Sequence, residues 1–380
     1  FRAGVNAGNS IESGGNYNTV VGDEAGTAIT TGDANVAIGF RTLDANTTGT
    51  NNTAVGLAAL GANTSAANNT ALGYSALTAN TTGASNIAIG VEALDANTAG
   101  NRTIAIGQAA FGALNHTSST NNYGVAIGHN AGLSVTTGTI NTLIGGLAGD
   151  AITTGNSNIA LGYQALSADT TGDRSTALGF QTLANQNFTS NTDTYNTAVG
   201  YNAGVNVTTG LENTLIGGEA GDALTDADFN VAVGRQALSA DTLGSRSVAI
   251  GWGALRFQNF TSAASTYNTA VGMNAGTSIT TGTQNALIGG LAGDALTDAD
   301  SNVAMGHSSL STDTLGSRSV AIGASALEAQ NFTSATNTYN VAVGTLAGAA
   351  VTTGINNTLI GGIAGDAITT ASSNTALGYF

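Results

Sequence analysis

A five-residue pattern of polar and apolar positions repeats along the chain. It consists of asparagine, a threonine or aliphatic residue, alanine, a large aliphatic residue and glycine, as in Asn69 to Gly73. The motif glycine occurs 21 times between Gly22 and Gly378, separated by sixteen 17-residue intervals and four 21-residue intervals. Repetition at a fixed period indicates a solenoid. Because no gap breaks the series, we expect one continuous array over residues 1–380, with 21 regular units and no separate cap, tip or catalytic domain.

A longer period lies on top of this one from about residue 103 onward. One 21-residue unit is followed by three 17-residue units, which gives a 72-residue super-repeat. The long units open at four motif glycines: Gly107, Gly179, Gly251 and Gly323. The pattern indicates duplication of a four-unit block.

The residue types within a unit favour strands and turns. Threonine, valine and isoleucine favour strands, and a glycine in every unit disfavours a helix. Segments such as Asn80 to Gly83 supply turns. We therefore expect an all-β fold, a β-solenoid of the β-roll type with stacked 17-residue coils and periodic 21-residue coils. Each coil would hold two short strands and two turns, about 4.8 Å from the next coil.

Both faces of the motif strand are apolar. The residue before the motif glycine is always a large aliphatic, such as Leu72, which we expect to be buried; the residue before that, usually alanine, points the opposite way. A strand with one wet face would alternate apolar and polar residues. We therefore predict that one face fills the coil and the other packs against partner chains, in a homotrimer with side-by-side or intertwined copies. Changing Ala71, Ala88 or Ala160 to aspartate would then break assembly.

The motif asparagine recurs in 16 of the 21 units. Stacked amides can form a hydrogen-bonded ladder along the array. An asparagine can equally satisfy the backbone of its own turn. Both interpretations are structural.

The motif carries a resemblance to known fibrous proteins. At Asn86 to Gly90 (Asn-Ile-Ala-Ile-Gly) the chain resembles the head repeats of trimeric autotransporter adhesins, which form a left-handed β-roll. The fuller unit from Asn69 to Gly83 looks still more like the repeat shaft of phage-type tail-fibre proteins. The resemblance spans essentially the whole chain, although the adhesin repeats are shorter than the 17-residue unit found here.

The resemblance implies a structural shaft of an extracellular fibre, on a virion tail or a bacterial cell surface, that supports host or surface attachment. Both ends of the chain fall in mid-repeat, so we expect partners among other segments of the same fibre or end-to-end stacking. A cell-surface glycan or protein receptor is a further expected partner. The alternative is a monomeric binding solenoid, such as an ice- or glycan-binding protein, with threonine columns from the Thr-Thr-Gly segments.

The composition and net charge disfavour some classes of binding partner. The net charge is −15, all eight basic residues are arginine and only 8% of residues are charged. This balance disfavours nucleic acid and anionic membrane surfaces. No apolar run is long enough to cross a membrane, so we expect no membrane insertion. The absence of cysteine excludes disulfides.

No set of serine, histidine and acid recurs in a catalytic pattern. We therefore expect no enzymatic activity, no cofactor and no metal. Asp222, Asp226 and Asp228 could approach a cation between coils, but solvated turn carboxylates are the favoured interpretation.

Two recurring features remain as candidate contacts. Arginines recur with the 72-residue period, five positions before the first glycine of each long unit, at Arg102, Arg174, Arg246 and Arg318. Three of them follow an aspartate by five residues, at Asp169, Asp241 and Asp313. A surface ion pair and a contact between chains are the two alternatives for these arginines.

Aromatic residues in the inserts of the long units are the second feature. They suit contact with a glycan or receptor, and packing of the phenylalanines over the coil is the alternative. The residues are Phe188, Tyr195, Phe260, Tyr267, Phe332 and Tyr339.

Overall fold

The computed structural model describes residues 1–379, which form strands and turns and contain no helix. The fold is an all-β parallel solenoid of about 22 coils, which confirms the all-β solenoid of the predicted fold class; the homotrimer stays a prediction. The chain divides into two compact units, residues 1–194 and 195–379, and each is described by itself. The single uninterrupted array therefore stays a prediction.

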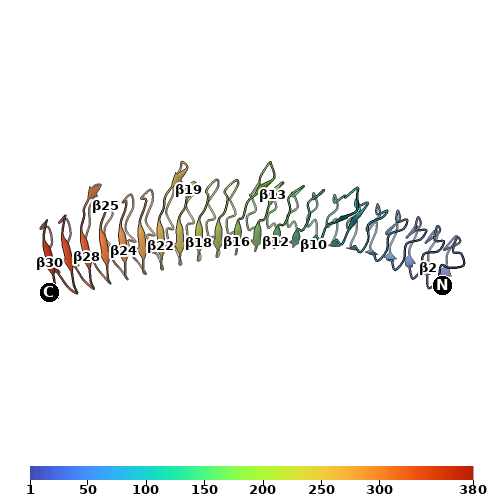
Figure 1. The fold of residues 1–380 in the computed structure, drawn as a ribbon, viewed down its shortest axis with the longest axis horizontal. Helices are drawn as coiled ribbons and strands as arrows, with labels where there is room; N and C mark the ends of the chain where they lie inside the picture. The colour runs from blue at the N-terminus through green and yellow to red at the C-terminus, as the bar shows by residue number, and fades with distance from the viewer. Residues whose placement is uncertain (380) are drawn as a thin grey trace. The chain divides into compact units, whose positions relative to one another are not determined.

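In the first unit, one short strand per coil pairs in parallel with its neighbours to form the main sheet (Figure 1). These strands are β1 (Arg2–Ala3), β2 (Thr19–Val21), β3 (Val36–Ile38), β4 (Thr53–Val55), β5 (Thr70–Leu72), β6 (Ile87–Ile89), β8 (Ile104–Ile106), β10 (Val125–Ile127), β11 (Thr142–Ile144), β12 (Ile159–Leu161) and β14 (Thr176–Leu178). Two-residue strands pair across the long coils: β7 (Gly100–Asn101) with β9 (Thr120–Asn121), and β13 (Gly172–Asp173) with β15 (Thr192–Asp193).

The second unit repeats the plan. Its main strands are β16 (Thr197–Val199), β17 (Thr214–Ile216), β18 (Val231–Val233), β20 (Val248–Ile250), β22 (Thr269–Val271), β23 (Ala286–Ile288), β24 (Val303–Met305), β26 (Val320–Ile322), β28 (Val341–Val343), β29 (Thr358–Ile360) and β30 (Thr375–Leu377). Its two-residue strands pair across the long coils, β19 (Gly244–Ser245) with β21 (Ala264–Ser265) and β25 (Gly316–Ser317) with β27 (Thr336–Asn337). The labelled two-residue strands β13, β19 and β25 lie at the side of the coils away from the main strands (Figure 1).

The register of the main sheet confirms one repeat per coil. In β5 and β6, Ala71 pairs with Ala88, the equivalent alanine of the next repeat. Across the first long coil the step is longer by the length of the insert, because Ala105 pairs with Ala126. Equivalent residues of successive repeats therefore lie beside each other as columns.

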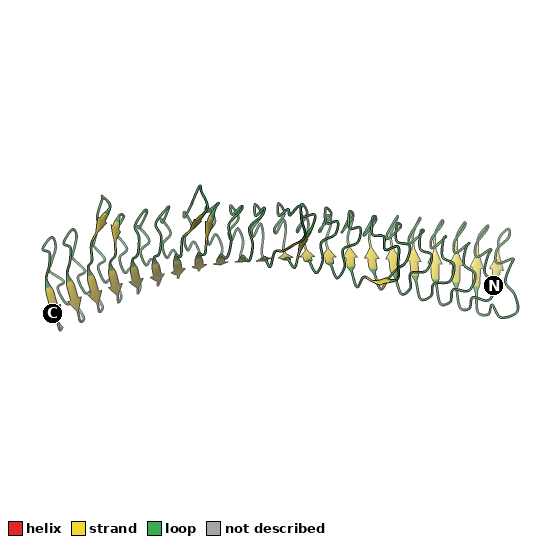
Figure 2. Cartoon of the chain, turned by 45° about the horizontal axis from the view of Figure 1, so that its top comes forward, coloured by secondary structure: helices red, strands yellow, loops and turns green. Residues whose placement is uncertain are grey.

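The prediction of two strands per coil is wrong for most coils. They have a single three-residue strand, and loops make up most of the rest (Figure 2); a second, two-residue strand occurs only in the long coils and in the coils that precede them. After the motif glycine the backbone turns sharply through left-handed residues, such as Ser75 at φ 52° and Leu77 at φ 54°. Residues other than glycine rarely adopt this conformation, so the segment cannot continue as a strand.

The motif glycine is required by its backbone. Gly73 has φ 139°, and a Cβ atom there would lie 2.4 Å from the carbonyl oxygen of Gly90 in the next coil. Only glycine adopts this conformation and permits so close an approach between coils.

The assignment of the two strand faces also needs correction. The alanine column, including Ala71 and Ala88, is fully buried inside the coil, whereas Leu72 is 46% exposed on the outer face. The alanines, Ala160 included, therefore do not face partner chains, and the prediction that aspartate there breaks assembly is wrong. A 17-residue coil has a narrow interior, and the small side chain fits there. It follows that an aspartate at Ala71 or Ala88 would disrupt folding before it affected assembly.

The residues that fill the interior differ between coil types. In one coil type Leu77 and Ala71 are both fully buried. In the Gly-Gly coils, Gly149 takes the position of that leucine, and the space is filled by Leu143 and Ile152. A Cβ at Gly149 would lie 2.8 Å from Leu143 and 2.9 Å from Ile152.

The motif asparagines bond mainly to backbone atoms of other coil segments. The Asn69 side chain donates from Nδ2 to the Gly83 carbonyl at 2.9 Å and accepts at Oδ1 from the Asn86 N–H at 2.9 Å. Direct amide-to-amide bonds occur as well, as from Asn52 Nδ2 to Asn35 Oδ1 at 3.2 Å. The asparagine column thus combines amide-to-amide hydrogen bonds with hydrogen bonds to the backbone. The backbone bonds include one to the next coil and do not serve the asparagine's own turn.

Candidate functional site

The four predicted arginines occupy one column on the surface. Each lies five residues before a motif glycine, is exposed and has a left-handed backbone, with φ between 57° and 66°. This column lies immediately before the main strand, so its side chains point away from the coil at every step.

The arginine side chains stack on aromatic rings in the same column. The guanidinium carbon of Arg102 lies 5.7 Å from the ring centre of Tyr123, and that of Arg318 lies 5.8 Å from Tyr339. Arg246 instead lies 5.1 Å from Phe229 and donates to Ser265 Oγ at 2.6 Å. These distances fit cation–π contacts between neighbouring coils.

The arginines do not pair with the aspartates that precede them by five residues. Arg174 forms an ion pair with Asp193, an insert residue, while Asp169 is buried inside the coil. The proposed surface ion pair with Asp169, Asp241 or Asp313 is therefore wrong. A contact between chains stays a prediction for the arginines.

The buried aspartates anchor the inserts. Asp241 Oδ1 accepts from the N–H groups of Gly244 and Phe260 at 3.0 Å, and Oδ2 accepts from Gln258 Nε2 at 2.5 Å. Gln258 also bonds to Ser247 Oγ at 2.8 Å. Burial raises the pKa of the equivalent Asp169, and hydrogen bonds from Gln186, Phe188 and Gly172 oppose the rise. Sequence reasoning missed this network, although a glutamine recurs at the equivalent position of the coil after each aspartate.

The six predicted aromatic residues separate into two environments. Phe188, Phe260 and Phe332 are 7–8% exposed and pack inside the long coils. Tyr195, Tyr267 and Tyr339 are about half exposed. Of these residues, only the tyrosines present a ring at the surface.

The first long coil differs from the other three. His116 stands where they have phenylalanine, and its Nε2 lies 3.1 Å from Asn122 Nδ2 in the buried interior. Burial lowers the pKa of His116. The amide donor requires a neutral ring with an accepting Nε2.

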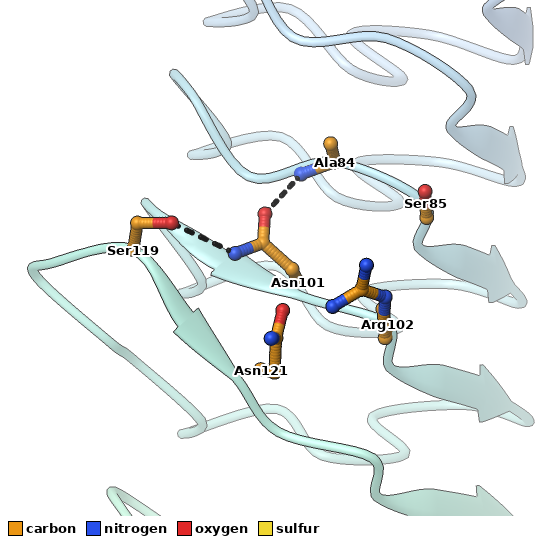
Figure 3. A pocket seen from close by; sticks show the side chains of 6 residues that line it. All are labelled: Ala84, Ser85, Asn101, Arg102, Ser119 and Asn121. Carbon is orange, nitrogen blue, oxygen red and sulfur yellow. Dashed lines mark hydrogen bonds between the residues drawn. The ribbon is translucent and has the colours of Figure 1, made fainter.

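A polar hollow of about 250 Å³ lies beside Arg102 (Figure 3). Asn101 forms one wall, and its amide is fixed by a 2.7 Å bond from the Ala84 N–H and a 3.1 Å bond to Ser119 Oγ. The full lining is Ala84, Ser85, Asn101, Arg102, Ser119 and Asn121. The hollow combines one guanidinium with amides and hydroxyls, which suits a small polar ligand.

Metal sites and membrane-spanning helices are two further features that would bear on function. Among residues 1–379, no three His, Cys, Asp or Glu side chains gather as metal ligands. Within the same range, no helix has the length and hydrophobicity to cross a membrane. No protein-family model and no curated protein matches this chain.

Proposed function

We propose that this chain forms the shaft of an extracellular fibre, on a phage tail or a bacterial surface, and that it does so as a homotrimer. The observation that carries the proposal is the outer apolar stripe, meaning the column of aliphatic residues before the motif glycines. Ile38, Leu72 and Leu161 in the first unit are 38–46% exposed. Ile216 and Met305 in the second unit are 39% exposed.

The stripe calls for a partner because the coil interior is already full. Alanines and leucines of the same chain fill it, so the outer aliphatics have no place inside. Covering a half-exposed leucine stabilises by about 1 kcal/mol, and this gain recurs with every coil. A partner must present apolar groups at the same coil spacing, and a second copy of this chain does so by construction. The number three rests on the resemblance to trimeric fibres.

The role of a shaft follows from the repetition. One coil geometry recurs with the same register and the same buried alanines, and each coil contacts its neighbours along the stack. Such arrays act as spacers and display surfaces. Attachment of the fibre to a host or surface, and an extracellular location, belong to the same proposal.

Sedimentation equilibrium tests the oligomer. We expect three times the chain mass of 37.1 kDa. A triple variant of the stripe, Ile38→Asp, Leu72→Asp and Leu161→Asp, should lose mass to smaller species. A matched triple variant should keep the mass of the oligomer. It changes three exposed turn threonines: Thr31→Asp, Thr48→Asp and Thr82→Asp. A wild-type monomer at micromolar concentration would contradict the proposal.

A monomeric binding solenoid is the second candidate, favoured by threonines on the same outer face. Thr53 and Thr70 lie two residues from Val55 and Leu72, at the spacing of the coils. A regular threonine and aliphatic surface suits ordered water or ice. A monomeric mass together with thermal hysteresis in freezing assays would establish this candidate in place of the trimer.

A further inference from the structure

We propose that the hollow beside Arg102 binds an acidic sugar residue through its carboxylate. The proposal starts from the guanidinium. Arg102 is exposed, its stack on Tyr123 and a 3.4 Å bond to the Tyr123 hydroxyl hold its plane, and no acidic side chain pairs with it in the part of the chain that the structure describes. A planar guanidinium with free donors is the side chain best suited to a carboxylate.

The second 72-residue block shows which group completes such a site. There Arg174 takes the position of Arg102, and Asp193 takes the position of Asn121. Arg174 and Asp193 form an ion pair within the chain. The chain thus supplies a carboxylate to the second arginine, and in the first block the amide of Asn121 leaves that place to a ligand.

The rest of the lining favours a sugar over a bare anion. The Asn101 amide is oriented by hydrogen bonds with Ala84 and Ser119. Asn121 and Ser85 add an exposed amide and hydroxyl. Paired amides and hydroxyls match the donors and acceptors of sugar hydroxyls, and the half-exposed Tyr123 ring offers an apolar surface beside them.

The binding should be weak and sensitive to salt. The chain has a net charge of −15, which repels an anion at long range. Exposed ion pairs are also screened by salt. For a single hexuronate we expect a Kd of about 1 mM. The inference requires that no partner chain covers Arg102.

The experiment uses D-glucuronate, D-glucose and acetate with the full chain, followed by saturation-transfer NMR and calorimetric titration. We expect glucuronate to bind at least about tenfold more tightly than either glucose or acetate. Equal binding of acetate would overturn the sugar assignment, and equal binding of glucose would overturn the role of the carboxylate. No detectable glucuronate binding at about 50 mM, far above the expected Kd, would overturn the site.

The matched variant is Asn121→Asp, which installs the carboxylate of the second block without removing a contact of Arg102. It should weaken glucuronate binding at least about tenfold, because the new carboxylate competes for the guanidinium. Undiminished binding in this variant would overturn the proposal. If Asn121→Asp failed to fold, Arg102→Gln should give the same loss of glucuronate binding. Undiminished glucuronate binding by Arg102→Gln would also overturn the proposal.

Discussion

Replacing Asn69 by alanine removes one rung of the motif asparagine column. The Asn69 side chain is fully buried and serves two backbone groups, the Gly83 carbonyl and the Asn86 N–H, each at 2.9 Å. Alanine leaves the Asn86 N–H without this partner, whereas the Gly83 carbonyl still accepts from Asn80 Nδ2 at 2.9 Å. Water cannot replace the amide unless the coil opens.

The size of the effect follows from the Asn86 N–H. A buried backbone donor that loses its partner costs about 1–3 kcal/mol, so the variant should lose about 1–3 kcal/mol of unfolding free energy. This loss belongs to the mechanism of buried unsatisfied polar groups. In a stack of coils the damage should spread to the neighbouring coils.

Urea unfolding followed by circular dichroism measures the loss, and hydrogen exchange locates it. The Asn86 amide should exchange faster in the variant than in the wild type. The neighbouring Asn68→Ser provides the control, because Asn68 is exposed and serine occupies the equivalent position at Ser85. We expect the control to change stability by about 0.5 kcal/mol or less. A loss below about 1 kcal/mol for Asn69→Ala, with an unchanged m-value, would refute the assignment.

Three further predictions follow from buried groups. Ala71→Asp should abolish folding, because it buries an unpaired charge inside the coil, and a folded variant with reduced oligomeric mass would contradict the inward orientation. Burial raises the pKa of Asp222 to about 6 from 3.8, so stability should rise as the pH falls from 7 to 4; Asp222→Asn should add about 1–2 kcal/mol at pH 7 after allowance for solvent screening, whereas Asp366→Asn, at the exposed equivalent position, should not. Burial lowers the pKa of His116, so the first long coil should lose stability below about pH 6.5. The free energy of opening, obtained from hydrogen exchange after correction for the intrinsic pH dependence of exchange, should no longer fall there in a His116→Phe, Asn122→Thr variant, which carries the residues of the second block.

The period of the chain could be predicted from sequence because it depends on spacing alone. A 17-residue step between Ala71 and Ala88 is visible as a repeated motif, and the register follows from it. The orientation of the strand was not predictable from polarity, since Ala71 and Leu72 are both apolar. Side-chain volume would have decided it, because a narrow coil admits alanine at every step and leucine only where a glycine makes room.

The second strand was predicted in error because local preference was overridden by packing. Leu77 adopts φ 54°, a conformation in which leucine has no intrinsic advantage. It is held there because its side chain is fully buried and its N–H bonds to Ala93 in the next coil at 2.9 Å. The residue types of a single repeat do not predict this left-handed turn.

The hollow beside Arg102 could not be predicted from the sequence, because it depends on a difference between two blocks. Arg102 and Arg174 lie at equivalent positions. The structure shows that Asp193 forms an ion pair with Arg174, whereas the equivalent Asn121 has no carboxylate to offer Arg102. The exposed column that holds them also carries tyrosine, serine, glutamate and phenylalanine in other coils, all with the same left-handed backbone. Buried columns fix the coil and this column does not, so one position can change chemistry from block to block without cost to the fold. A repeated scaffold of this kind can change its surface chemistry by substitution at exposed positions, as between Asn121 and Asp193.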